Sequence, residues 1–98
     1  MSKFTFTNEE VAAWTEKHKI PDYMREGIRH YLVEHEETGD FLRAVFENDL
    51  VEAIKRADDT NRQHLRSYCA LLYWELPGRG QEGSPWGSAK AYKDWVKQ

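Results

Sequence analysis

The sequence has little of what marks disulfide-rich or membrane-spanning proteins. Cys69 is the only cysteine in the 98 residues, which excludes an intramolecular disulfide and a zinc site built from several cysteines. No apolar run approaches the roughly 20 residues of a membrane-spanning helix. The N-terminal segment MSKFTFTNEE lacks the apolar stretch of a signal peptide. We therefore expect a cytoplasmic protein with no membrane partner.

A strong charge of either sign is also absent. The chain has 17 acidic and 14 basic side chains and a net charge of -3, so its overall charge indicates no particular partner. The aromatic share of 13%, with four tryptophans, is high for a small chain. A single domain of this length has room for one modest core, to which aromatic side chains contribute much.

Apolar residues recur with the spacing of helices rather than strands. The pattern predicts helices over about 8–18, 21–39, 40–46, 49–57, 60–76 and 88–96. We predict an all-α fold, a compact single-domain bundle (1–98) of five to six short helices. An extended arm (1–6) precedes it, and a flexible glycine-rich loop (77–87) precedes the last helix.

Local signals define several of these helix ends. Thr7 and Glu10 form a capping box, Asp49 with Glu52 forms a second capping pair, and Ser88 caps the last helix. Gly39 is expected to end its helix in a left-handed conformation, with Asp40 as the next N-cap.

The helical stripes also predict which side chains are buried. Leu50, Ala53, Ile54 and Ala57 should form one buried face. A wider one should comprise Leu65, Tyr68, Cys69, Leu71, Leu72, Trp74 and Leu76. Gly27 inside a helix indicates the close approach of a neighbouring helix.

Gly78 to Gly83 spell GRGQEG, the G-x-G-x-x-G spacing of dinucleotide-binding loops. That motif needs a strand before its first glycine and a helix opening at its third. Here a helical pattern and Pro77 precede the loop, and only 15 residues follow Gly83. We interpret the loop as a connector and expect no cofactor.

No catalytic or metal-binding set stands out. His30 and Glu34 lie four residues apart on one helix face and could supply two zinc ligands, but a third ligand is missing. Cys69 is expected in the core, where a thiol is a poor nucleophile. We expect no metal and no enzyme activity.

Two sets of residues are candidates for partner binding. The first is the acidic cluster Glu34, Glu36, Glu37 and Asp40, which could meet a basic protein surface, together with Trp86. Trp86 is either a lid over the core or an exposed anchor, and the lid is favoured. The second, an alternative nucleic-acid surface, comprises Arg62, Arg66, Lys90 and Lys93. Arg62 and Arg66 should share a helix face, although neighbouring carboxylates dilute their field.

The chain resembles a family of small proteins encoded by phages and prophages in the order of several short sequence motifs. These motifs are IPxYM from Ile20, GxFLxAV from Gly39, ENDL from Glu47, RAD from Arg56 and WGS from Trp86. The resemblance spans about residues 20–96. The glycine-rich segment before the WGS motif is longer than the link that the resemblance suggests. The resemblance implies a helical fold and expression in a bacterial cytoplasm, but no assigned activity.

These observations favour a non-enzymatic phage accessory protein that binds a host protein. By analogy with other small phage proteins, it would inhibit a bacterial defence system, as anti-CRISPR proteins do, or modulate a host enzyme. The alternative is a nucleic-acid-binding regulator. Homo-oligomers are compatible with either function.

Overall fold

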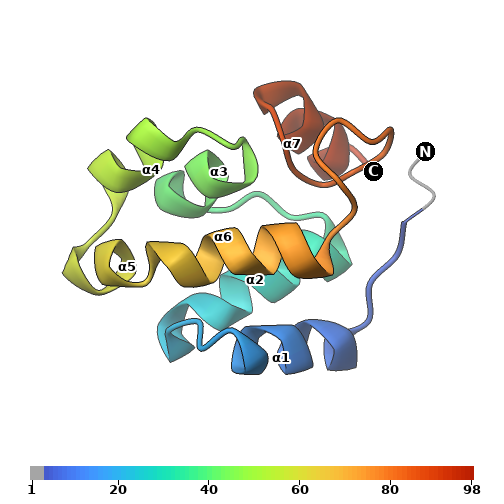
Figure 1. Cartoon of the computed structure of the whole chain (residues 1–98). Helices are drawn as coiled ribbons and strands as arrows, with labels where there is room; N and C mark the ends of the chain where they lie inside the picture. The colour runs from blue at the N-terminus through green and yellow to red at the C-terminus, as the bar shows by residue number, and fades with distance from the viewer. Residues whose placement is uncertain (1–3) are drawn as a thin grey trace.

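Seven α-helices and no strand form in residues 4–98, the part of the chain that the computed structural model describes (Figure 1). They are α1 (Asn8–Lys17), α2 (Asp22–Glu34), α3 (Asp40–Phe46), α4 (Leu50–Arg56), α5 (Asp59–Gln63), α6 (Leu65–Glu75) and α7 (Ala89–Val96). The predicted all-α single domain is confirmed, with one more helix than expected. None of the helices in this range is long and apolar enough to cross a membrane. The first half of the predicted N-terminal arm lies outside the described residues.

The capping signals read from the sequence operate as predicted. The Thr7 hydroxyl accepts a hydrogen bond from the Glu10 backbone N–H at 3.1 Å, and the Glu10 carboxylate accepts one from the Thr7 N–H at 2.9 Å. Asp49 caps α4 through the Glu52 N–H, and Ser88 caps α7 through the Ala91 N–H. Each cap satisfies a backbone donor that the first turn of a helix leaves free.

The end of α2 differs from the prediction. The helix ends at Glu34, and His35 rather than Gly39 takes the left-handed conformation, with φ 59°. Gly39 is extended and is itself the N-cap of α3, so Asp40 is the first residue of that helix. The His35 ring stacks on Trp95 and its Nδ1 lies 2.9 Å from the Trp95 carbonyl oxygen. Tertiary contacts therefore hold a non-glycine residue in a conformation that costs about 1 kcal/mol.

The predicted helix over 60–76 is two helices, α5 and α6, that meet at His64. Asp58 caps α5 by accepting from the Asn61 N–H at 2.7 Å. Asn61 is buried, and its side chain accepts a hydrogen bond from the Tyr68 hydroxyl at 2.6 Å. A buried polar contact thus fixes the break, which apolar periodicity does not reveal.

The centre of the core is an aromatic stack around Tyr31 of α2. Its ring centroid lies 4.2 Å from that of Phe46 in α3 and 5.1 Å from that of Tyr92 in α7. The Trp95 indole N–H donates to the Tyr31 carbonyl at 2.7 Å. Burial raises the pKa of the Tyr31 hydroxyl, which donates to the Pro85 carbonyl at 2.6 Å. α2, α3 and α7 are therefore joined by rings whose polar atoms are paired.

Gly27 has the structural role that the sequence suggests. A Cβ atom built there would lie 3.1 Å from Leu42 Cδ1 of α3. That distance is tighter than ordinary van der Waals contact. The Leu42 side chain of α3 therefore packs closely against α2 at this position.

The glycine-rich loop packs onto this core after a helix, α6, and not after a strand. Ser84, Pro85 and Trp86 are buried. The Trp86 indole N–H donates to the Pro77 carbonyl at 2.6 Å, and the Gly87 N–H donates to the Phe46 carbonyl at 2.9 Å. The loop therefore lacks the strand that a dinucleotide-binding motif requires.

Candidate protein-binding face

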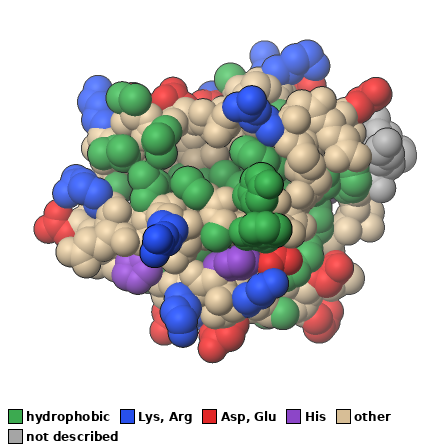
Figure 2. All heavy atoms as spheres, viewed as in Figure 1, with side chains coloured by type: hydrophobic (Ala, Val, Ile, Leu, Met, Phe, Trp, Pro, Cys, Tyr) green, Lys and Arg blue, Asp and Glu red, His purple; other side chains and the backbone are tan. Residues whose placement is uncertain are grey.

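Large hydrophobic side chains gather on the outer face of α4 and α6. Of the six exposed ones among residues 4–98, five lie on these two helices: Leu50 (54% exposed), Val51 (79%), Ile54 (41%), Tyr73 (70%) and Trp74 (69%). We call these five side chains, with the exposed Cys69, the apolar face. In Figure 2 hydrophobic side chains spread over the region where Figure 1 shows α4 and α6.

A shallow groove connects the two halves of this face. It is lined by Ala44, Val45, Asn48, Asp49, Leu50, Ala53, Leu65, Tyr68, Cys69 and Leu72. Tyr73 follows Cys69 by one helical turn, so its side chain lies on the same side of α6 as Cys69, beyond the residues that line the groove. These two rings meet edge to face with centroids 4.7 Å apart.

The exposure of the apolar face corrects four sequence predictions. Leu50, Ile54, Cys69 and Trp74 were expected in the core and are exposed. α4 packs against α3 with its small residue Ala53 buried, and leaves its larger side chains outside. α6 is buried along Tyr68, Leu71 and Leu72 on its other side. Helical periodicity places residues on one face but cannot tell whether another element covers it.

Two cations border the apolar face without ion-pair partners. Five of the seven arginines form ion pairs with carboxylates: Arg25, Arg29, Arg43, Arg56 and Arg62. Arg66 precedes Cys69 by one turn of α6, and Lys55 follows Val51 by one turn of α4. Both are exposed, and within residues 4–98 neither has a carboxylate within ion-pair distance.

The nearby carboxylates are already engaged. Glu52 accepts from the Arg56 guanidinium at 2.7 Å, and Asp49 caps α4. Glu75 contacts His18 at 2.7 Å and Lys17 at 2.9 Å. The hydrogen bond with His18 has the largest effect in lowering the pKa of Glu75, followed by that with Lys17. Arg66 and Lys55 therefore have no ion pair of their own, although Lys55 acts electrostatically on Glu52, and Asp49 keeps its negative charge.

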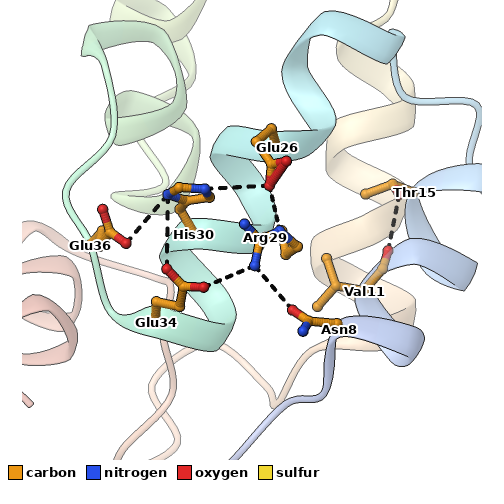
Figure 3. Close-up of polar contacts among 8 residues, drawn as sticks. All are labelled: Asn8, Val11, Thr15, Glu26, Arg29, His30, Glu34 and Glu36. Atoms are coloured by element: carbon orange, nitrogen blue, oxygen red, sulfur yellow. Dashed lines mark hydrogen bonds and ion pairs between the residues drawn. The ribbon is translucent and has the colours of Figure 1, made fainter.

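The acidic cluster predicted from the sequence is split by the structure. Figure 3 shows Glu34 and Glu36 beside His30, whose other ring nitrogen faces Glu26. Glu36 lies 3.3 Å and Glu34 4.0 Å from His30 Nδ1. Hydrogen bonding with Glu36 and then with Arg29 lowers the pKa of Glu34.

The other two members of the acidic cluster, Glu37 and Asp40, form no ion pair with His30. Asp40 pairs with Arg56 of α4 at 3.3 Å. Glu37 is exposed and acts electrostatically on Arg43 of α3. The cluster is therefore not one continuous surface, and two of its four carboxylates, Glu34 and Asp40, pair with arginines of the chain.

His30, Glu34 and Glu36 form a three-ligand group that sequence reasoning missed. One ligand atom of each lies within 4.8 Å of the others. Glu36 is beyond the end of α2, and the left-handed turn at His35 brings it back toward His30, so helical spacing gave no signal for it. The three side chains are half-buried or exposed, and their ion pairs with each other and with Arg29 account for the arrangement. We assign no metal to it.

The four cations of the alternative nucleic-acid surface do not come together. Arg62 lies on α5 and Arg66 on α6, and Arg62 is bound to Asp59 and to the Ala57 carbonyl oxygen. Lys90 and Lys93 lie on α7, which Figure 1 places at the opposite end of the molecule from α5. Lys90 is paired with Asp94. The prediction that Arg62 and Arg66 share a helix face is therefore wrong.

The sequence left two roles open for Trp86, a lid over the core or an exposed anchor. The structure shows that it is a lid. It is only 9% exposed and belongs to the core. A side chain so buried offers little area to a partner. Beside it, an open hollow of about 830 Å³ lies between the glycine-rich loop and α7, lined by both cations and carboxylates.

Comparisons with known proteins add no relative from which a function could be transferred. No family model matches the chain, and no curated protein or solved structure matches it either.

Proposed function

We propose that this chain is a non-enzymatic protein-binding module whose binding surface is the apolar face. One observation carries the proposal: five of the six large hydrophobic side chains exposed among the described residues lie on α4 and α6. Large exposed apolar side chains gathered on one part of a surface are typical of interaction sites. Exposed Trp and Tyr are also the side chains most often found as energetic anchors of interfaces.

The resemblance to small phage proteins supports a setting for this binding. In this proposal the chain is a phage accessory protein in the bacterial cytoplasm. Its partner is a host protein, either a component of a defence system that it inhibits or an enzyme that it modulates. The acidic cluster, first expected to be the contact surface, is a weaker candidate because His30, Arg29 and Arg56 already pair with it.

The experiment is an affinity capture from nuclease-treated lysate of a bacterial host, followed by mass spectrometry. The bait is the full chain, compared with a Val51→Glu/Tyr73→Glu variant. Both positions are largely exposed, so the charges should block docking without unfolding the chain. Ala13→Glu, on the exposed side of α1, is the control for an added carboxylate elsewhere.

We expect one stoichiometric host protein with the wild-type chain and with Ala13→Glu, and its loss with the double variant. Retention of that protein by the double variant would show that the partner binds another surface. Recovery of nuclease-sensitive material alone would favour the nucleic-acid alternative.

A further inference from the structure

The groove of the apolar face restricts the backbone conformation of whatever lies in it. Its lining is apolar except for Asn48 and Asp49 at one end and the hydroxyl of Tyr68, and that hydroxyl already donates to Asn61. A segment lying there finds few partners for its own N–H and C=O groups. Since buried backbone groups must be paired, the segment has to pair them internally, as an α-helix does.

The charges at the border of the groove restrict the side chains of that helix. Arg66 and Lys55 have no ion-pair partner among the described residues, whereas Glu52 and Glu75 pair with cations of the chain. Asp49 caps α4 but keeps its negative charge. An approaching carboxylate would therefore find two cations to pair with, and an approaching cation would find only the Asp49 carboxylate.

Resting on the proposed function, we infer that the segment that docks on the apolar face is an amphipathic helix whose apolar side is flanked by Asp or Glu. Leu50, Ile54 and Tyr73 contact its apolar side, and Arg66 and Lys55 contact its carboxylates. The positive border sets the preference for acidic flanks, while the apolar contacts supply most of the affinity.

The same charges disfavour two other occupants. A second copy of this chain would bring the same two unpaired cations to the interface and only the Asp49 carboxylate to meet them. An anionic membrane surface would suit an apolar face with cations, but membrane recognition commonly uses clusters of several Lys and Arg. This face offers two free cations in a chain of net charge -3.

The test uses two synthetic amphipathic peptides that share one leucine face and differ only in their flanks, Glu in one and Lys in the other. Binding of each labelled peptide to the full chain is followed by fluorescence anisotropy at about 0.15 M and about 1 M salt. We expect the Glu peptide to bind about tenfold more tightly than the Lys peptide at the lower salt, and less so at the higher.

Charge reversal identifies the residues that set this preference. Arg66→Glu/Lys55→Glu should invert it in favour of the Lys peptide. The matched control is Arg79→Glu/Lys93→Glu. Like Arg66 and Lys55, Arg79 and Lys93 are exposed and form no ion pair among the described residues, but they lie outside the apolar face. This control should leave the preference unchanged.

The outcomes that overturn the inference differ from those that overturn the proposed function. Equal binding of both peptides, lost in Val51→Glu/Tyr73→Glu, would keep the binding face and remove its acidic specificity. Concentration-dependent self-association in sedimentation, abolished by the same variant, would make a second copy the occupant. Binding to phosphatidylserine vesicles but to neither peptide would make the face a membrane surface and overturn both proposals.

Discussion

Tyrosine and tryptophan side chains are buried around Tyr31 and exposed on the apolar face. Tyr31 and Trp95 are at most 1% exposed, lie against neighbouring rings and have their polar atoms paired. Tyr73 and Trp74 are about 70% exposed, and their rings meet edge to face. Folding buries the first pair and leaves the second in water. The comparison therefore separates aromatic residues that stabilise the fold from aromatic residues that are free to bind.

The largest expected effect comes from removing a ring on the buried side. Trp95→Ala should lower the free energy of unfolding by about 3–5 kcal/mol, because it leaves a cavity and removes the bond to the Tyr31 carbonyl. Urea denaturation followed by circular dichroism measures the change. Trp74→Ala is the matched control on the apolar face and should change the same quantity by less than about 0.5 kcal/mol. Similar losses in both variants would contradict the comparison.

A smaller effect is expected where the glycine-rich loop joins the core. Gly87 has φ 128°, and a Cβ there would lie 2.8 Å from Arg79 Cγ. Gly87→Ala should therefore destabilise the chain by about 1–3 kcal/mol, measured as a lower urea midpoint.

Gly39→Ala is the control for that change. Gly39 has φ -69°, and nothing lies within 4 Å of a Cβ built there. Because Ala is less favourable than Gly at an N-cap, the substitution should cost less than about 1 kcal/mol. A loss as large as that of Gly87→Ala would instead favour the left-handed helix end that the sequence first suggested.

The junction between α1 and α6, beside Trp74, should depend on pH. The pKa of Glu75 is held below its ordinary value of 4.5, so its ion pairs stabilise the fold above that pH and are lost as the pH falls through the lowered value. Glu75→Gln should therefore lose less stability than the wild type on acidification from about pH 5 to about pH 2.5, by less than about 1 kcal/mol.

Urea midpoints across that range measure the Glu75 contribution. Glu9→Gln, an exposed residue of the same α1 region, is the control and should follow the wild type. If Glu75→Gln also follows the wild type, its ion pairs contribute nothing measurable to the acid response.

The smallest effect on stability is expected on the apolar face itself. Val51→Glu/Tyr73→Glu should leave the free energy of unfolding within about 0.5 kcal/mol per site of the wild type, because both side chains are mostly in water. Thermal unfolding followed by circular dichroism measures it. A large loss would mean that these side chains support the fold, and the comparison between the two regions would fail.

The parts of the fold that were predictable are those set by short-range chemistry. Thr7 with Glu10, Asp49 and Ser88 cap their helices because a side-chain oxygen lies three residues before a free backbone N–H. Where a distant contact took part, prediction failed. Trp95 holds His35 in the left-handed turn, and Tyr68 binds the Asn61 side chain near the break between α5 and α6.

The candidate site was less predictable than the fold. Leu50, Ile54 and Trp74 follow the spacing of buried residues, and nothing local distinguishes them from Leu71 or Leu72. Likewise, nothing in the spacing of Glu36 shows that it would join His30 and Glu34.

By itself the sequence determined that this chain is helical, where most helices begin, and which side chains share a face within one unbroken helix, since these depend on contacts within a few residues. Only the tertiary structure decided which of those faces is covered. α4 turns Ala53 toward α3, and α6 turns Tyr68 and Leu71 inward, so Leu50, Val51, Ile54, Tyr73 and Trp74 remain outside. Burial depends on which elements meet in space, and one helix's pattern does not contain that information.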